Sequence, residues 1–374
     1  MSPRNDARLR PKKAKQKGAV GSGPACHQPI ISTTADRERR EIMRVLKDGE
    51  AVPADLIGAV IALGNFDGVH RGHQAVLSCG KAIADDLGAS LGVMTFDPHP
   101  RSYFDPSAEL FALSPLDQKF KLLASLGIDF TSVLTFDKRL AGLTAEAFIE
   151  QILVERWQVA HVIVGYNFLF GKGRNGTPQT LSAVGAENGF GVTIIEPESR
   201  DGQVFSSSAI RNLLREGRVR EAADILGYWW TVSGSVEHGA GRGHSLGYPT
   251  VNVMLRPGQD LHHGIYAARV WVDGHRFDGA AYNGRRPTFD NGIAKLEVFL
   301  FDFNESLYGH QIDVELIDFI RPDEAFDSAE ALIAQMDRDC ADARDILVKI
   351  NSADPMLNYP IGRFISAAIT TARA

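Results

Sequence analysis

Cysteine is scarce in this chain of 374 residues, and Cys26, Cys79 and Cys340 lie far apart in the sequence. No CxxC pair occurs, which argues against a zinc knuckle and a disulfide framework. No apolar run approaches the ~18 residues that span a bilayer. The pattern GxxxxGK[ST] is also missing, which excludes a P-loop. These absences predict a protein of the reducing cytoplasm that does not contact a membrane.

Positive charge is in deficit, since the formal net charge is -6. The deficit is uneven along the chain, because residues 1–42 contain ten Lys and Arg against four Asp and Glu. The remainder therefore carries a net charge of about -12. An acidic body argues against a nucleic-acid groove, so we expect no nucleic-acid partner.

The first 42 residues lack apolar periodicity and are rich in Lys, Arg, Pro and Gly. This composition predicts a disordered, basic extension. No apolar region follows the basic residues, which argues against a secretory signal. A transit peptide and an upstream start, with the first domain beginning at Met43, are two alternatives that the sequence leaves open.

Residues 43–227 alternate between strand and helix patterns. Short apolar runs bounded by turn residues predict strands at 59–63, 90–96, 132–136, 161–164 and 192–195. Helical periodicity lies between them, and Thr144 can cap one of the helices. Alternation of this kind predicts a parallel sheet covered on both faces. Ligands of such sheets lie beyond the carboxyl ends of the strands.

Residues 228–350 change to period-two patterns, at 231–239, 250–255, 264–272, 275–282, 296–303 and 311–320. Asp273-Gly274 is a strong signal for a hairpin turn. These patterns predict a small antiparallel β-barrel. A helix over 331–350 follows, with Asp327 and Glu330 as a candidate capping box. Residues 351–374 form a C-terminal tail without a clear role.

The stretch GNFDGVHRGH, residues 64–73, joins a predicted strand to a predicted helix. A glycine-rich turn that leads into a helix N-terminus favours anions, because free N–H groups point outward there. His70 and His73 can add hydrogen bonds to phosphate oxygens. Structural histidines or a metal pair are the alternatives. For Asp67 we expect a role in the turn or at a metal.

Three further groups of polar residues stand out. In TFDPHP, Asp97 and His99 follow a strand, where substrate contact and a turn at Asp97-Pro98 are equally open. The serines of SSSAIR, residues 206–211, precede a helix and can cap it or donate to phosphate. Thr250 and Asn252 are two residues apart on one strand, so they face the same side.

The motifs together resemble a known family. GNFDGVHRGH resembles the HxGH motif of the nucleotidylyltransferase superfamily in the form found in bacterial FAD synthetases. TFDPHP, VGYNFLFGKGRNG and SSSAIR follow in the expected order. HGAGRGHSLGYPTVN, GRRPTF and LEVFLFDF are similar to riboflavin kinases. The resemblance covers about residues 43–350 and is to the bacterial bifunctional riboflavin kinase/FMN adenylyltransferases.

The resemblance implies an α/β Rossmann-like nucleotidylyltransferase domain at 43–227 and a riboflavin kinase β-barrel at 228–350. The barrel would phosphorylate riboflavin to FMN with Mg²⁺ and ATP. The first domain would then join FMN to AMP from a second ATP, giving FAD and pyrophosphate. Retention of only one activity, adenylyl transfer to another acceptor, and a flavin-sensing protein on the same scaffold are the alternatives. We expect small-molecule substrates and a monomer or weak homo-oligomer.

The resemblance also assigns roles to particular residues. The catalytic residues would be His70, His73 and Glu297, with Glu297 accepting the proton of the ribityl hydroxyl. Nucleotide and phosphate binding would fall to Gly64, Asn65, Gly68, Gly72, Asn167, Ser207, Ser208, Arg211, Gly241, Gly243, Gly247 and Thr250. Asp97, His99 and Arg321 would bind substrate, and Thr250 with Asn252 would hold the metal.

Overall fold

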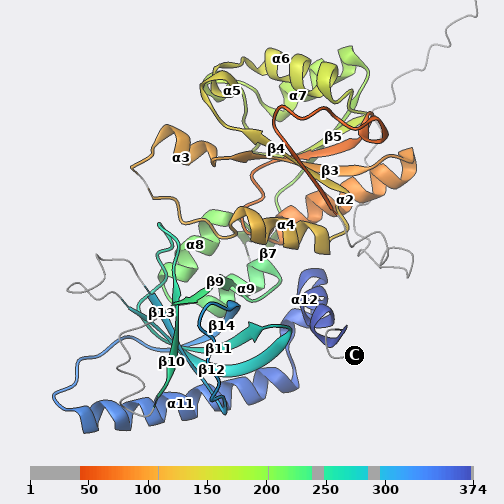
Figure 1. Cartoon of the computed structure of the whole chain (residues 1–374). Helices are drawn as coiled ribbons and strands as arrows, with labels where there is room; N and C mark the ends of the chain where they lie inside the picture. Colours follow the sequence, from red (N-terminus) through yellow and green to blue (C-terminus); the bar gives the residue numbers. More distant parts are fainter. Residues whose placement is uncertain (1–42, 108, 201, 238–247, 285–294, 372–374) are drawn as a thin grey trace, which may run out of the picture.

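The structure is a computed structural model that describes residues 43–371, except 108, 201, 238–247 and 285–294. An α/β domain precedes a β-barrel domain, and a long helix runs along the barrel (Figure 1). The predicted fold class is therefore confirmed, both for the parallel sheet and for the closed antiparallel barrel.

The α/β domain is built on a parallel sheet whose described strands have the order β1-β4-β3-β2-β5-β6. The strands are β1 (Arg44–Lys47), β2 (Val60–Leu63), β3 (Leu91–Asp97), β4 (Phe130–Thr135), β5 (His161–Gly165) and β6 (Gly191–Ile195). The five predicted strands are confirmed, with boundaries that differ by at most two residues. The sequence did not predict β1, which is short and only half-buried at the sheet edge.

Helices cover both faces of this sheet. In Figure 1, α6 and α7 lie on one face, and α2 and α4 lie on the other. The helices are η1 (Ala54–Leu56), α2 (Arg71–Leu87), α3 (Pro100–Phe104), α4 (Leu116–Ser125), α5 (Lys138–Gly142), α6 (Ala145–Phe148), η2 (Ile149–Arg156), η3 (Lys172–Arg174), α7 (Pro178–Asn188), α8 (Ser207–Arg215) and α9 (Val219–Leu226). A hairpin of β7 (Ser199–Arg200) and β8 (Gln203–Val204) precedes α8. The predicted cap is confirmed, since the Thr144 hydroxyl accepts from the Ala147 N–H at 3.1 Å.

The barrel closes in the order β10-β13-β12-β11-β14-β9. Its strands are β9 (Thr231–Glu237), β10 (Thr250–Met254), β11 (Gly264–Val272), β12 (His275–Gly284), β13 (Lys295–Leu300) and β14 (Gln311–Arg321). Asp273 and Gly274 join β11 to β12 with φ of 48° and 76°. Two consecutive positive φ values are those of a tight hairpin turn, as the sequence predicted.

Helix α11 (Ala329–Ser352) packs on the outside of the barrel, against β11, β12 and β14. The sequence placed its cap one residue too early. Ser328, and not Asp327, accepts from the backbone N–H of Ala331 at 3.1 Å. The chain then continues through η4 (Pro355–Asn358) into α12 (Pro360–Thr371), which lies against α4 of the first domain.

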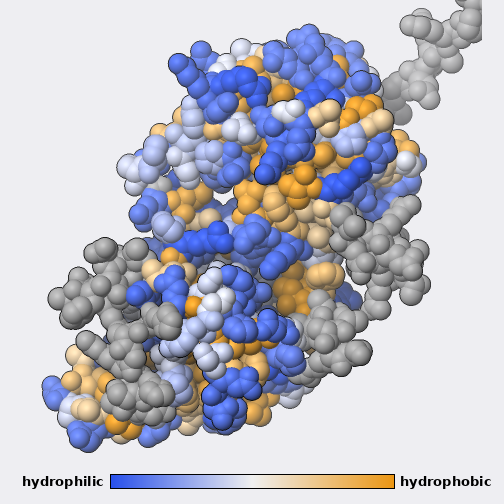
Figure 2. Space-filling model, viewed as in Figure 1, coloured by the Kyte–Doolittle hydropathy of each residue, from blue (hydrophilic) through white to orange (hydrophobic). Residues whose placement is uncertain are grey.

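The two domains share one apolar core. The Trp230 indole N–H donates to the carbonyl of Leu113 at 3.0 Å, and its ring packs on Phe111. The face shown in Figure 2 mixes hydrophobic and hydrophilic residues over both domains. Within the described part of the chain, no helix has the length and apolarity needed to cross a membrane. The shared core fixes the barrel against the sheet, so the candidate sites have defined relative positions.

Candidate active sites

The loop between β2 and α2 brings His70 and His73 together. The rings stack with centroids 3.7 Å apart and an interplanar angle of 23°. His70 is the N-cap of α2, and its Nδ1 accepts from the His73 backbone N–H at 3.4 Å. Phe66 and Val69 adopt φ of 47° and 38° within the turn. The glycine-rich sequence thus produces a tight turn that presents both imidazoles at a helix N-terminus.

Burial keeps both imidazoles neutral near pH 7. Burial lowers the pKa of His70 to about 4, and the negative charge of Asp67 offsets only part of that shift. Burial lowers the pKa of His73 well below its ordinary value, and repulsion from protonated His70 and from Lys119 acts in the same direction. Because Nδ1 of His70 accepts a hydrogen bond, its proton lies on Nε2. His70 can therefore donate a hydrogen bond without carrying a charge.

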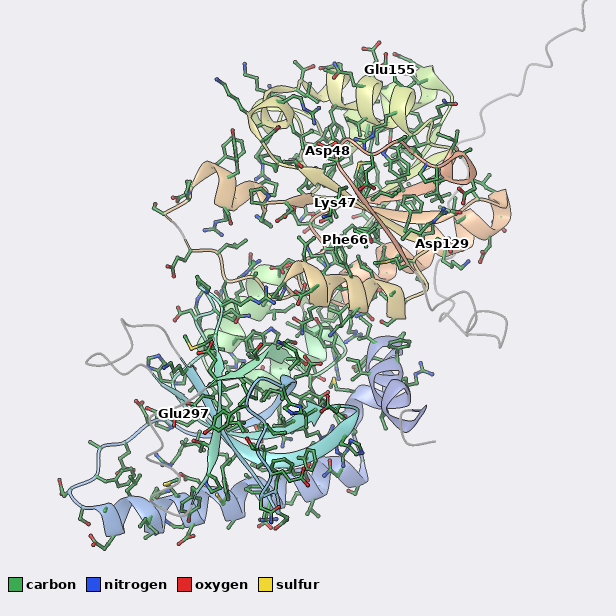
Figure 3. All side chains as sticks on the ribbon, in the orientation of Figure 1. Lys47, Asp48, Phe66, Asp129, Glu155 and Glu297 are labelled. Carbon is green, nitrogen blue, oxygen red and sulfur yellow. The ribbon has the colours of Figure 1, made fainter. Side chains whose placement is uncertain are left out.

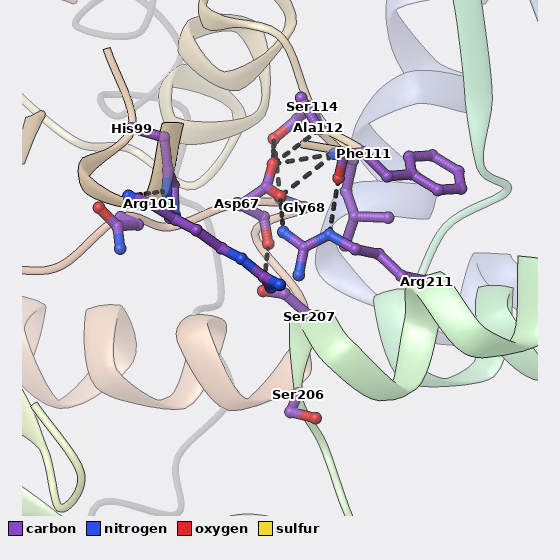
Figure 4. Close-up of polar contacts among 12 residues, drawn as sticks. Asp67, Gly68, His99, Arg101, Phe111, Ala112, Ser114, Ser206, Ser207 and Arg211 are labelled. Atoms are coloured by element: carbon purple, nitrogen blue, oxygen red, sulfur yellow. Dashed lines mark hydrogen bonds and ion pairs between the residues drawn. The ribbon is translucent and has the colours of Figure 1, made fainter. Parts of the chain in front are cut away.

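Asp67 organises the same turn (Figure 4). Its carboxylate accepts from the backbone N–H groups of Leu113 and Ser114, both at 3.0 Å. Arg211 of α8 donates from Nη2 to Asp67 Oδ2 at 2.5 Å. Asp67 therefore has the turn role that was one of its two predicted roles. These contacts join residues 64–73, which we call the HxGH loop, to α8 and to the segment before α4.

The predicted phosphate-binding residues of α8 lie next to this turn. Ser207 donates from its hydroxyl to the Asp67 carbonyl at 2.9 Å, and Ser208 is exposed. Ser206 is the helix cap, since it accepts from the Ala209 N–H. Arg211 also donates from Nε to the Phe111 carbonyl at 2.6 Å. The structure thus places Ser207 and Arg211 beside the HxGH loop, where both already have protein partners.

The predicted glycines allow close approach around the loop. Gly68 has φ of +79°, and a Cβ there would lie 3.0 Å from the Leu113 side chain. A Cβ on Gly64 or Gly72 would meet the ring of Phe66 or His70 at 3.1 or 3.2 Å. A side chain at Gly68 would therefore be strained as well as crowded.

Lys119 is a site residue that the sequence analysis missed. Its Nζ donates to the Asn65 carbonyl at 2.8 Å, and the side chain is only 6% exposed. Burial lowers its pKa, while the carboxylates of Asp67 and Asp97 oppose that shift. Lys119 lies on the apolar stripe of α4 together with Leu122 and Leu123. A lysine in such a stripe was the available signal, because lysine is seldom buried unless it is paired.

Asp97, His99 and Asn167 lie at the carboxyl ends of β3 and β5, the two strands on either side of β2. Asp97 ends β3 and is exposed, and the Asp97-Pro98 peptide is cis. His99 caps α3 by accepting from the Arg101 N–H at 3.0 Å, and burial lowers its pKa to about 4. Asn167 is exposed directly after β5. The carboxyl ends of β3, β2 and β5 therefore bring these residues to the edge that carries the HxGH loop.

The second candidate site lies on the outer face of the barrel, where Glu297 is labelled in Figure 3. Asn252 of β10 pairs directly with Glu297 of β13, and Thr250 pairs with Phe299. Leu296, Val298 and Leu300 fill the barrel interior, so the alternate residues face outward. Asn252 is buried and Glu297 is half-buried. The three predicted residues Thr250, Asn252 and Glu297 are thus brought to one face.

Glu237 is a second carboxylate at this site that the sequence analysis did not name. It pairs with Asn252 from the other side, on β9. Hydroxyl, amide and carboxylate oxygens are the ligands that Mg²⁺ prefers, so the donor set fits that ion. Among the described residues no group of three His, Cys, Asp or Glu side chains forms a metal site. A Mg²⁺ ion here would therefore also need oxygens of the nucleotide.

Arg321 and the segment before β10 contact α11. Arg321 donates from Nε and Nη2 to the two carboxylate oxygens of Asp339 at 2.8 and 2.7 Å. Its guanidinium lies 5.8 Å from the ring centroid of Phe326. Tyr248 packs on Phe299 and donates to Asp337 of the same helix. Helix α11 therefore forms one wall of the barrel site. The predicted Gly241, Gly243 and Gly247 lie outside the described residues.

Comparisons with known proteins agree with the two-domain architecture. The family profile described as FAD synthetase matches residues 52–209, and the profile described as riboflavin kinase matches residues 226–347. Together the two matches cover most of the described chain. The His70–His73 loop falls in the first, and Thr250, Asn252 and Glu297 fall in the second.

Several curated proteins match over most of their length, and each is named bifunctional riboflavin kinase/FMN adenylyltransferase. The protein of Listeria monocytogenes is 36% identical over 79% of this chain and 94% of its own. The Escherichia coli protein is 37% identical over 77% and 92%, and the Bacillus subtilis protein is 35% identical over 76% and 91%. A solved Streptococcus pneumoniae structure, titled macrolide-efflux protein, is similar with a TM-score of 0.71 and 28% identity, over 79% of this chain and 97% of its own.

Proposed function

Because this chain belongs to the family of bifunctional riboflavin kinases/FMN adenylyltransferases, we propose that it makes FAD from riboflavin in two ATP-dependent steps. The barrel phosphorylates riboflavin to FMN, and the α/β domain adenylylates FMN to FAD. One observation carries the proposal. The stacked pair of His70 and His73 lies at a helix N-terminus within the region matched by the FAD synthetase profile. The cross-strand pair of Asn252 and Glu297 lies within the region matched by the riboflavin kinase profile.

In the adenylylation step, an oxygen of the FMN phosphate attacks the α-phosphorus of ATP. A bond forms between them, and the bond from that phosphorus to the pyrophosphate oxygen breaks. Neutral His70 and His73 donate hydrogen bonds to the phosphate oxygens, where negative charge develops. The free N–H groups at the start of α2 act in the same direction. No covalent intermediate with the enzyme is needed.

Other residues at this sheet edge hold the two substrates. Gly64, Asn65, Gly68, Gly72 and Asn167 line the nucleotide side, and Asp97 and His99 contact the flavin substrate. The exposed Ser208 adds a hydroxyl donor at the start of α8, and Ser207 can add a second one when its hydroxyl leaves the Asp67 carbonyl. Arg211 is paired with Asp67. A phosphate group competes with that carboxylate for the guanidinium, which can bind either one through two N–H groups.

In the kinase step, Glu297 accepts the proton of the terminal ribityl hydroxyl, and that oxygen attacks the γ-phosphorus of ATP. The bond from the γ-phosphorus to the bridging oxygen of the β-phosphate breaks, and ADP leaves. Thr250 and Asn252 would hold Mg²⁺ and the ATP phosphates on the same face. When bound, Mg²⁺ neutralises charge on the phosphates. Arg321 contacts the flavin from the α11 side.

The reaction needs only small-molecule partners. The acidic net charge of -6 argues against nucleic acid as a partner. We place the enzyme in the cytoplasm, where riboflavin and ATP meet, and expect a monomer or weak homo-oligomer. Each chain carries both sites, so no second copy is required to complete either one.

One incubation tests the proposed function. Purified protein is mixed with riboflavin, Mg²⁺ and excess ATP, and the flavins are separated over time. We expect FMN to rise first and then to be replaced by FAD. Accumulation of FMN without FAD would contradict adenylylation. Tight flavin binding without conversion would instead indicate a flavin sensor. FMN supplied in place of riboflavin isolates the second step.

A further inference from the structure

The segment that follows α11 connects the barrel to the α/β domain. Asp354 anchors it to the barrel, because its carboxylate accepts from Arg269 Nη1 at 2.5 Å and from the Trp229 indole N–H at 3.1 Å. Both donors belong to the barrel side, and Arg269 is only 3% exposed. Met356 packs into the apolar cluster beneath α11. The start of this segment is therefore fixed to the kinase domain.

The same segment reaches the first turn of α2 through Tyr359. The Arg71 guanidinium carbon lies 4.9 Å from the Tyr359 ring centroid and 4.6 Å from that of Phe205. Arg71 Nη1 also donates to the Asp224 carbonyl at 3.2 Å. Two aromatic rings and a carbonyl thus surround this guanidinium. A guanidinium stacked on aromatic rings loses much of its rotational freedom.

Arg71 adjoins the histidines of the adenylylation site in the sequence. It directly follows His70 and comes two residues before His73, in the first turn of α2. Phe205, its second aromatic partner, directly precedes the serines at the start of α8. One side chain therefore joins the two loops that the proposed mechanism places around the phosphates. A shift of Arg71 would move the histidines relative to Ser207.

We propose that Tyr359 is a positioning residue for FMN adenylylation, which it supports from the kinase side by holding Arg71 against Phe205. The inference rests on the proposed function of the α/β domain. It gives a role to the C-terminal segment, which lies beyond the residues matched by the riboflavin kinase profile. Neighbouring Ile361 is fully buried and anchors α12, so Tyr359 can be replaced while the helix keeps its apolar contact.

The test compares the full-length wild-type protein with Tyr359→Ala, Tyr359→Phe and Leu357→Ala. Leu357 lies in the same segment with an exposed side chain and serves as the matched control. FMN adenylylation and riboflavin phosphorylation are measured on the same samples, together with the melting temperature. The kinase reaction reports whether the barrel is intact, and adenylylation reports the effect on the other domain.

We expect Tyr359→Ala to lower kcat of adenylylation about fivefold to tenfold, with riboflavin phosphorylation within twofold of wild type. Tyr359→Phe keeps a ring over Arg71 and should restore adenylylation. In a double-mutant cycle, Arg71→Met combined with Tyr359→Ala should be no slower than Arg71→Met alone, because the two residues act as one unit. A general loss of stability would not give this non-additivity or the rescue by Phe.

Two outcomes would overturn the inference. Wild-type adenylylation in folded Tyr359→Ala would remove the role of Tyr359 and leave the proposed function intact. Equal losses of both activities in Tyr359→Ala, with additive effects in the cycle, would show a general structural role instead. A wild-type protein that makes FMN but no FAD would overturn the proposed adenylylation, and the inference would fall with it.

Discussion

The guanidinium of Arg211 donates to the carboxylate of Asp67 across 2.5 Å, although 144 positions separate the two residues. Both side chains are about nine-tenths buried. The pair closes the HxGH turn onto α8 and keeps Arg211 among the loops that the proposed mechanism uses. The stability of the fold and the availability of Arg211 to a phosphate therefore both depend on the Asp67–Arg211 pair.

Asp67→Asn should lower the free energy of unfolding by about 3 kcal/mol, because it leaves a buried guanidinium without its counter-charge. Chemical denaturation followed by tryptophan fluorescence measures the loss. Asp55→Asn is the matched control, since Asp55 pairs with Arg44 at an exposed surface. Surface ion pairs contribute little, so its effect should be much smaller. Equal effects of the two substitutions would contradict a structural role for the Asp67–Arg211 pair.

Glu297→Gln and His73→Gln should separate the two activities. Glu297→Gln removes the proton acceptor of the kinase step, so FMN formation should fall at least about a hundredfold. Adenylylation of supplied FMN should remain. His73→Gln should give the opposite pattern, because its imidazole lies on α2, in the α/β domain. Time courses started from riboflavin and from FMN measure both steps. Loss of both activities in either variant would argue against two independent sites.

The sequence predicted elements whose information is local. Apolar runs between turn residues located β2 to β6, and Asp273-Gly274 located the β11–β12 turn. Strand β1 was missed because it has only four residues, two of them exposed, and depends on pairing with β4. The cap of α11 was assigned to Asp327 because Asp and Ser are both good caps, and only the backbone path selects Ser328.

Local sequence patterns could not predict contacts between residues that are far apart in the chain. The sequence grouped His70 with His73 and Thr250 with Asn252 because their spacing fixes their relative direction. Nothing local pairs Arg321 with Asp339, or places Lys119 under Asn65. Both contacts depend on how helices pack against a sheet or barrel. The residues that tertiary packing brings to a site are therefore those that sequence analysis misses.

His70→Asn should reduce the pH dependence of stability. Burial lowers the pKa of folded His70 to about 4, from an ordinary value near 6.5. The unfolded state thus binds more protons between these values, and the folded state loses stability as the pH falls through this interval. At pH 5 the loss is about 2 kcal/mol relative to pH 7. Asn keeps an acceptor for the helix cap but does not titrate.

Comparison of the two proteins isolates this contribution. Burial raises the pKa of Glu315 to about 7, which changes stability in the opposite direction over a similar interval. That contribution is the same in wild type and His70→Asn, so it cancels in the difference. Urea denaturation at pH 5, 6 and 7 gives the two curves. Parallel curves would show that folding does not lower the pKa of His70.

Lys119→Met should slow FMN adenylylation at least about tenfold and leave riboflavin phosphorylation unchanged. The ammonium of Lys119 donates to the carbonyl of Asn65, within the HxGH loop. Met fills a similar volume without a donor or a charge. Lys121→Met is the matched control on the same helix, because Lys121 is exposed. Steady-state rates with FMN and with riboflavin measure both steps.

Normal adenylylation in Lys119→Met would show that the buried ammonium stabilises the fold without supporting the loop. A loss shared by Lys121→Met would assign the effect to the surface of α4. We expect a loss of adenylylation in Lys119→Met alone. That result would show that α4 supports the site through the contact between Lys119 and the Asn65 carbonyl.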